Sequence, residues 1–120
     1  RADNTRFYGS IKAKKIIATQ TGWADYVFDK DYKLMPLKDL STYIKQHKHL
    51  PEIPTTTQIE KEGVDVGTNQ ALLLKKIEEL TLYILQQQKE IAEQNRKMLE
   101  QQKSINNQQE EITALQKKIK

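Results

Sequence analysis

The chain has 120 residues, of which 37% are hydrophobic and 30% are charged. This apolar share lies below the roughly 45–50% of an ordinary globular domain, so the sequence excludes a large multidomain enzyme and predicts that much of the chain lies at a surface. The net charge of +4 divides equally between residues 1–70 and 71–120, cysteine is absent, and no run approaches the roughly 20 apolar residues of a membrane span, which argues against polyanion binding, disulfides and membrane insertion.

We expect a mainly α fold. It consists of a long parallel trimeric coiled coil and a small α+β region packed on the coil's N-terminal end. The predicted organisation is the end of a β-rich fibre shaft at residues 1–20, a small clamp region at 21–70 and the coiled coil at 71–120. Because the chain opens at Arg1 without Met, we read it as part of a longer polypeptide. The segment from Phe7 to Thr19, rich in Ile and Lys after Gly9, is typical of a strand.

An apolar cluster follows around residues 23–28. After it, Pro36 can open a helix that ends near His47, with apolar residues at helical spacing on one face. Together these two segments supply the predicted core of the small region: Trp23, Tyr26, Phe28, Leu37, Leu40, Tyr43 and Ile44.

Turn and capping residues delimit the next two elements. Thr55 or Thr56 can cap a short helix that stops at Gly63, a usual residue just past a helix end. The long helix is expected to begin at Gly67 or Thr68.

Seven heptads in one register follow Leu73. The a column is almost entirely isoleucine, and the d column has leucine at both ends with four consecutive glutamines between them. A 3.5-residue period held this long predicts a left-handed supercoil, so the helix needs a partner helix. The predicted a positions are Ile77, Ile84, Ile91, Met98, Ile105, Ile112 and Ile119, and the d positions are Leu73, Leu80, Gln87, Gln94, Gln101, Gln108 and Leu115.

The number of strands in the coil follows from the d column. Parallel dimers favour leucine at d, whereas isoleucine at a with glutamine at d favours a parallel homotrimer, in which the buried amides penalise wrong registers. A weak, partly frayed coil and a coil with a different partner chain are the alternatives. Four further apolar residues outside the seam, Leu74, Leu82, Tyr83 and Leu85, predict where the small helices dock.

Several separated blocks of sequence resemble a C-terminal module of fibre-like proteins from Bacteroidota bacteria and their phages, often labelled tail fibre proteins. The blocks are WADYVF at 23–28, YKL at 32–34, HLPEIP at 49–54 and LLKKIEELTLY at 73–83. The module looks similar to the intramolecular chaperone domains that trimerise phage tail spikes. The resemblance implies a structural, non-enzymatic trimerisation module, located outside the cell, on the cell surface or in a virion fibre. Self-cleaving relatives cut at a Ser-Asp junction, which this chain lacks.

Candidate chemistry is sparse. His47 and His49 form a pair that could bind a metal, but a third histidine and cysteine are absent, and the carboxylates at 25, 29 and 31 lack the glycine and glutamate of a calcium loop. No cofactor or nucleic-acid site is predicted. The aromatic residues at 23, 26 and 28 could instead form a glycan-binding face, so the second hypothesis is a tip that recognises a glycan or protein receptor.

Overall fold

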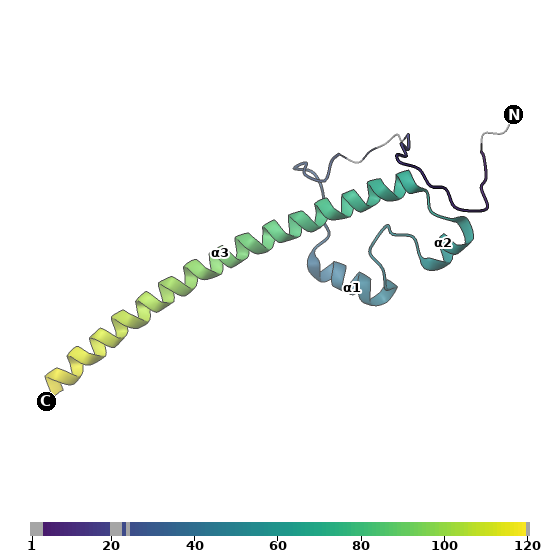
Figure 1. Ribbon diagram of the computed structural model, residues 1–120. Coiled ribbons are helices and arrows are strands. Elements are labelled where there is room, and N and C mark those ends of the chain that lie inside the picture. Colours follow the sequence, from purple (N-terminus) through teal and green to yellow (C-terminus); the bar gives the residue numbers. More distant parts are fainter. Residues whose placement is uncertain (1–3, 20–22, 24, 120) are drawn as a thin grey trace.

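The computed structural model describes residues 4–19, 23 and 25–119. Within this part the fold is mainly α, with three helices: α1 (Leu37–His47), α2 (Thr56–Glu62) and α3 (Val66–Ile119). The molecule measures 101 × 31 × 29 Å and has a radius of gyration of 26.8 Å. A compact chain of this length would have a radius of gyration of about 14 Å. The elongation comes from α3, whose 54 residues form a gently curved rod (Figure 1).

The two short helices begin and end at the residues that the sequence indicates. Pro36 precedes the first turn of α1, and Lys48, in a left-handed conformation at its end, donates a backbone hydrogen bond to the Ile44 carbonyl. Thr55 and Gln58 form a reciprocal capping box at the start of α2, which ends at Gly63. The predictions for both helices are therefore confirmed.

The long helix begins at Val66, slightly earlier than the expected Gly67 or Thr68. Asp65 is the reason, because its carboxylate accepts a 2.9 Å hydrogen bond from the backbone N–H of Thr68. Its own carbonyl oxygen accepts a second bond, 2.8 Å long, from the N–H of Asn69. An aspartate at this position is a strong helix start signal that the sequence reading passed over.

The expected strand between Phe7 and Thr19 is wrong. Residues 4–19 are irregular and exposed, and no strand occurs in the described part of the chain. A strand satisfies its backbone hydrogen bonds only by pairing with another strand. Nothing else in the described residues adopts a strand, so the small region is not α+β.

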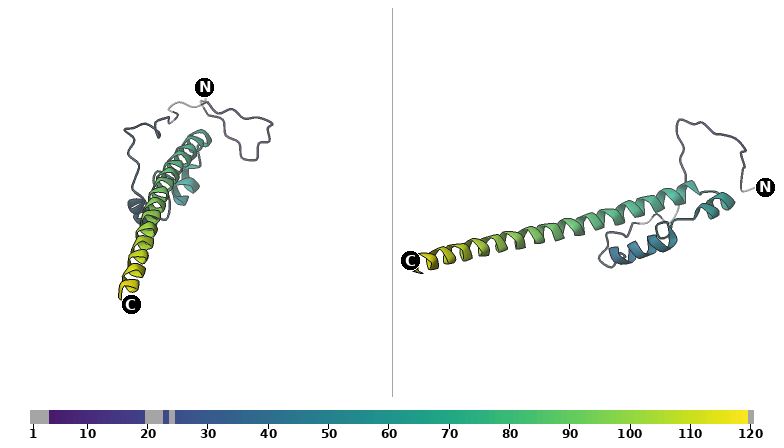
Figure 2. Two further views of the ribbon diagram at one scale, coloured as in Figure 1. Left: turned by 90° about the vertical axis from the view of Figure 1, so that its left-hand side faces the viewer. Right: turned by 90° about the horizontal axis from the view of Figure 1, so that it is seen from below.

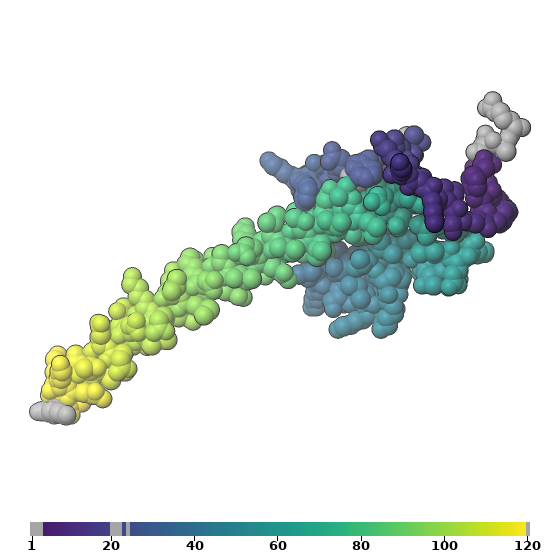
Figure 3. All heavy atoms as spheres, viewed as in Figure 1, coloured from purple at the N-terminus to yellow at the C-terminus, as the bar shows by residue number. Residues whose placement is uncertain are grey.

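Only the first third of α3 is covered by other parts of the chain. Helices α1 and α2 lie along one side of this N-terminal end, and residues 4–19 lie near its tip (Figures 1 and 2). Every residue from Ile84 to Ile119 is exposed, and the rod projects bare beyond the small region (Figure 3). Among the described residues, the buried apolar side chains are Val27, 1% exposed, and Tyr83, 9% exposed.

Candidate functional site

The a and d residues form an uncovered apolar stripe along α3. At the end covered by the small region, Leu73, Ile77 and Leu80 are still 46–58% exposed. The stripe continues to Ile119 and is interrupted only by the glutamine positions of the d column. A long helix with one such apolar face is not stable alone in water, so the stripe supports an oligomeric partner.

The small region packs on the flank of α3 beside this stripe, where Tyr83 and Lys76 occupy g positions. Tyr83 is buried, and Leu74 and Leu82 are half-buried, whereas Leu85 stays exposed at the edge of a shallow depression shared with Phe28. Tyr83 bonds to Met35, and Leu82 lines this depression with Val27 and Leu34, so these two positions meet the segment that precedes α1. Docking of the small helices at all four positions stays a prediction. This arrangement covers one flank of the helix, next to the d column, and leaves the seam residues exposed.

Tyr83 joins α3 to the segment that leads into α1. Its hydroxyl donates a hydrogen bond of 2.6 Å to the carbonyl oxygen of Met35, which lies 48 residues earlier in the chain. Burial raises the pKa of Tyr83, and the nearby carboxylate of Glu79 adds to this rise. The phenol therefore stays protonated and able to donate.

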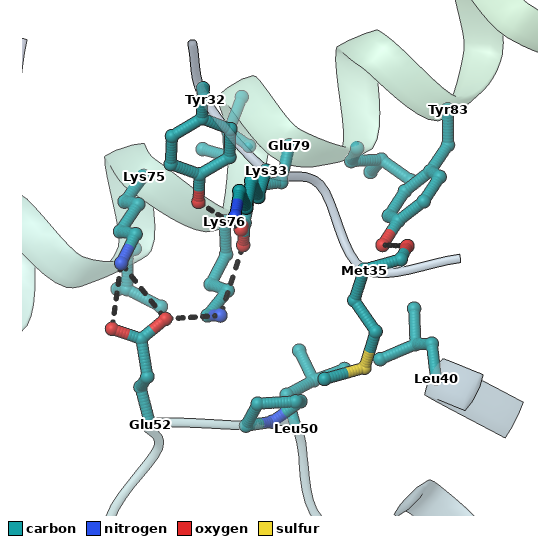
Figure 4. Close-up of a pocket in the computed structure, with 14 residues that line it drawn as sticks. Tyr32, Lys33, Met35, Leu40, Leu50, Glu52, Lys75, Lys76, Glu79 and Tyr83 are labelled. Atoms are coloured by element: carbon teal, nitrogen blue, oxygen red, sulfur yellow. Dashed lines mark hydrogen bonds and ion pairs between the residues drawn. The ribbon is translucent and has the colours of Figure 1, made fainter. Parts of the chain in front are cut away.

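A cluster of paired charges lies one turn further toward the N-terminus of α3. Lys75 and Lys76 both donate to the carboxylate of Glu52, at 2.7 and 3.1 Å. Lys76 also donates to Glu79 at 2.9 Å, and Glu79 accepts a hydrogen bond from the hydroxyl of Tyr32 (Figure 4). The two lysines and two glutamates balance, so the cluster ties the small region to α3 without net charge.

The pKa directions agree with this geometry. Partial burial would raise the pKa of Glu52, but hydrogen bonds from the two lysines outweigh it and hold the pKa below its ordinary value. Burial opposes the charged form of Lys75, yet its bond to Glu52 raises its pKa. For Tyr32, burial followed by the bond to Glu79 raises the pKa strongly. Both members of the Glu52–Lys75 pair are thus charged at neutral pH.

Glu52 occupies an unusual backbone conformation. The N–H of Ile53 donates to the carbonyl of Leu50 at 3.2 Å, and Glu52 has a φ of 70°. With Pro51 second and a positive φ third, residues 50–53 form a type II turn, whose third position normally holds glycine. A side chain here costs about 1 kcal/mol. The turn aims the Glu52 carboxylate at the two lysines, and the ion pairs offset the strain.

This turn leads to a testable prediction. Both Glu52→Ala and Glu52→Gly remove the carboxylate, but only alanine keeps the side-chain strain at positive φ. We expect both variants to be less stable than the parent chain, with alanine below glycine by about 1 kcal/mol. Urea unfolding at one protein concentration measures the difference. An alanine variant as stable as the glycine variant would show that the turn is unstrained.

A cavity of about 620 Å³ lies beside this cluster, between α3 and the small region (Figure 4). Its floor is formed by α3, and its opposite wall by Met35, Leu40 and the turn at Leu50. Three residues of the apolar stripe, Leu73, Ile77 and Leu80, also line it. The cavity is therefore continuous with the exposed face of the rod.

The residues predicted as the core of the small region are mostly at its surface in the single chain. Leu40 and Tyr43 are half-buried, while Trp23, Tyr26, Phe28, Leu37 and Ile44 are exposed. Tyr26 nevertheless packs against Tyr32, with ring centroids 5.7 Å apart, and lies 5.6 Å below the Lys75 ammonium. The buried member of this segment is Val27, which the sequence placed in the apolar cluster but not in the core.

The two histidines lie close together at the end of α1, with ring centroids 6.0 Å apart. Each ring donates from Nδ1 to a carbonyl oxygen, His47 to Tyr43 at 3.1 Å and His49 to Leu50 at 2.8 Å. His47 also stacks on the Tyr43 ring at 4.0 Å. Within residues 4–19, 23 and 25–119, no group of three potential metal-ligating side chains forms. The two histidines therefore bind carbonyl oxygens at the end of α1 and pack against an aromatic ring.

Comparison with family models, with curated proteins and with solved structures finds no match for this chain. No helix in the described part combines the length and apolar content needed to cross a bilayer. The candidate functional features of the described chain are the uncovered stripe of α3 and the adjoining cavity.

Proposed function

We propose that this chain is a homotrimeric assembly module of a fibre or surface protein located outside the cell, on the cell surface or in a virion. In this proposal α3 aligns three chains in parallel register through its a and d columns. The observation that carries it is the division of α3 into two faces. The small region covers one flank of the helix, while the seam stays exposed over its whole length.

Two features of the seam bear on the number of strands. Isoleucine fills six of the seven a positions, and four consecutive d positions hold glutamine. Isoleucine at a is compatible with both two and three strands. Leucine at d is what favours a dimer, and the four glutamine layers lack it. In a trimer, three amides at each layer can bond to one another or to water, and a shift by one heptad would place a glutamine against a d leucine at each end of the run.

The proposed mechanism is entropic. Three chains that meet only through distant segments must find one another at low concentration and in the correct register. Once the coil has formed, the remaining segments of the three chains are held at high effective concentration, so their assembly becomes an intramolecular step. The resemblance of residues 23–28, 49–54 and 73–83 to fibre modules that trimerise in this way agrees with such a role.

Sedimentation equilibrium of the 120-residue chain tests the proposal directly, because the mass it gives does not depend on the elongated shape. We expect a mass of three times 14.0 kDa. A stable dimer would overturn the trimeric seam, and a monomer at the concentrations used for folding measurements would overturn the assembly role itself.

A receptor-binding tip is the second candidate, and one observation favours it. Trp23, Tyr26 and Phe28 are exposed in the single chain, and aromatic rings at a surface are a common means of binding sugars or proteins. A glycan array probed with the assembled chain separates the two functions. Specific hits that are lost in Trp23→Ala would favour the tip, whereas an assembly module gives none.

A further inference from the structure

The cavity between α3 and the small region is open on one side. Leu40, Leu50 and Met35 face it from the small region, and Lys76, Tyr83 and the stripe residues face it from α3. The stripe residues Leu73, Ile77 and Leu80 remain about half exposed, so the cavity opens onto the side where a partner helix would lie. A single chain leaves this apolar space to water.

Heptad geometry specifies which part of a partner would face the opening. Lys76 and Tyr83, which both line the cavity, are g positions, directly beside the d positions Leu73 and Leu80. In a parallel coiled coil the g edge of one helix lies against the e edge of its neighbour. The cavity of one copy therefore faces the e edge of the next copy at the same height along the rod.

The chemistry of that edge suits the cavity. The e positions at this height are Leu74 and Thr81, followed by Gln88, and none carries a charge. Four of the five charges that line the cavity are already paired, because Lys75 and Lys76 bind Glu52 and Glu79, and the fifth, Lys33, is exposed. An uncharged edge can enter the cavity without burying an unpaired ion. A charged edge would lose its hydration there without gaining a partner of opposite charge.

We propose that the cavity is an intersubunit socket that receives the e edge of α3 from the neighbouring copy, around Leu74 and Thr81. This inference rests on the proposed parallel trimer. Each small region then contacts two helices, its own along the g edge and its neighbour's along the e edge, through Leu40 and Leu50. The socket closes the N-terminal end of the coil and fixes the register there, where apolar d residues replace the glutamines.

Crosslinking between two different single-cysteine variants tests the socket, because the natural chain has no cysteine. Leu40→Cys is co-expressed with a longer, tagged Thr81→Cys chain, and the assembled protein is treated with a short bifunctional maleimide. The expected product is a covalent pair of one tagged and one untagged chain. A second combination, Leu50→Cys with Leu74→Cys, examines the upper part of the socket. The matched control pairs Leu40→Cys with Gln86→Cys, on the back of α3, and should give no mixed product.

The outcomes distinguish the socket from the trimer. A mixed product in either test combination, together with none in the control, supports the socket. Trimers by sedimentation equilibrium that give no mixed product in both combinations would overturn the socket and leave the assembly role intact. A natural chain that sediments as a monomer would overturn both. Equal crosslinking to Thr81→Cys and Gln86→Cys would also overturn the socket, since it would show no preference for the e edge.

Discussion

Replacing both Ile91 and Ile105 with aspartate should dissociate the assembly. Both side chains are a positions and about half exposed in the single chain. Each substitution removes apolar burial of about 1.5–3 kcal/mol per chain and places three carboxylates together at one layer of a trimer. We expect sedimentation equilibrium to give the monomer mass, together with a large loss of helical circular dichroism.

A matched control isolates the seam from the general effect of added charge. Ala92 and Leu99 lie next to the seam residues but outside the a and d columns, and Leu99 is more exposed than either isoleucine. The double variant Ala92→Asp with Leu99→Asp adds the same charge to the same part of the rod and should keep the oligomer mass. If both double variants behave alike, the a column does not form the interface.

The second large effect is expected at Tyr83. Tyr83→Ala removes a buried ring, which costs about 3–5 kcal/mol, and it also removes the hydrogen bond to Met35. The small region should then detach from α3 while the lower coil persists. Hydrogen exchange of the α1 amides measures this detachment, because they should exchange as fast as in an unfolded segment while the helical signal of α3 is kept.

Two further substitutions separate the causes of this effect. Tyr83→Phe keeps the ring and removes only the hydroxyl, so it should cost about 1 kcal/mol and leave α1 largely protected. Tyr8→Ala removes a tyrosine that is almost fully exposed and should change nothing. Protection of α1 in Tyr83→Ala equal to that in the parent chain would mean that the ion-pair cluster alone holds the small region in place.

A few specific contacts, rather than a large apolar core, hold the small region on the N-terminal end of α3. Few apolar side chains are buried there, since residues 25–65 are too short to build a substantial core. One buried phenol, one buried valine and a neutral group of ion pairs hold the segment on the helix. In the proposed trimer, the neighbouring helices would supply the apolar surface that the single chain lacks.

The helices and the apolar face of the rod could be predicted from the order of the residues alone. Capping by Thr55 and Gln58, the stop at Gly63 and the heptad columns are interactions between residues a few positions apart, and such interactions leave a readable spacing. The helix start at Asp65 also depends on such a local interaction, so it too could have been predicted from the sequence. The strand was mispredicted because local composition shows only that a segment can extend, not whether a partner strand exists to pair with it.

The position of the small region on α3 could not be predicted, because it depends on contacts between residues far apart in the chain. The bonds of Tyr83 to Met35 and of Tyr32 to Glu79 join residues 48 and 47 positions apart, and no spacing rule predicts such pairs. The positive φ of Glu52 is likewise invisible in a Leu-Pro-Glu-Ile sequence, because glutamate ordinarily avoids that conformation. This strain is offset because two lysines from α3 bind the carboxylate. Those ion pairs form only when the preceding segment folds back along α3.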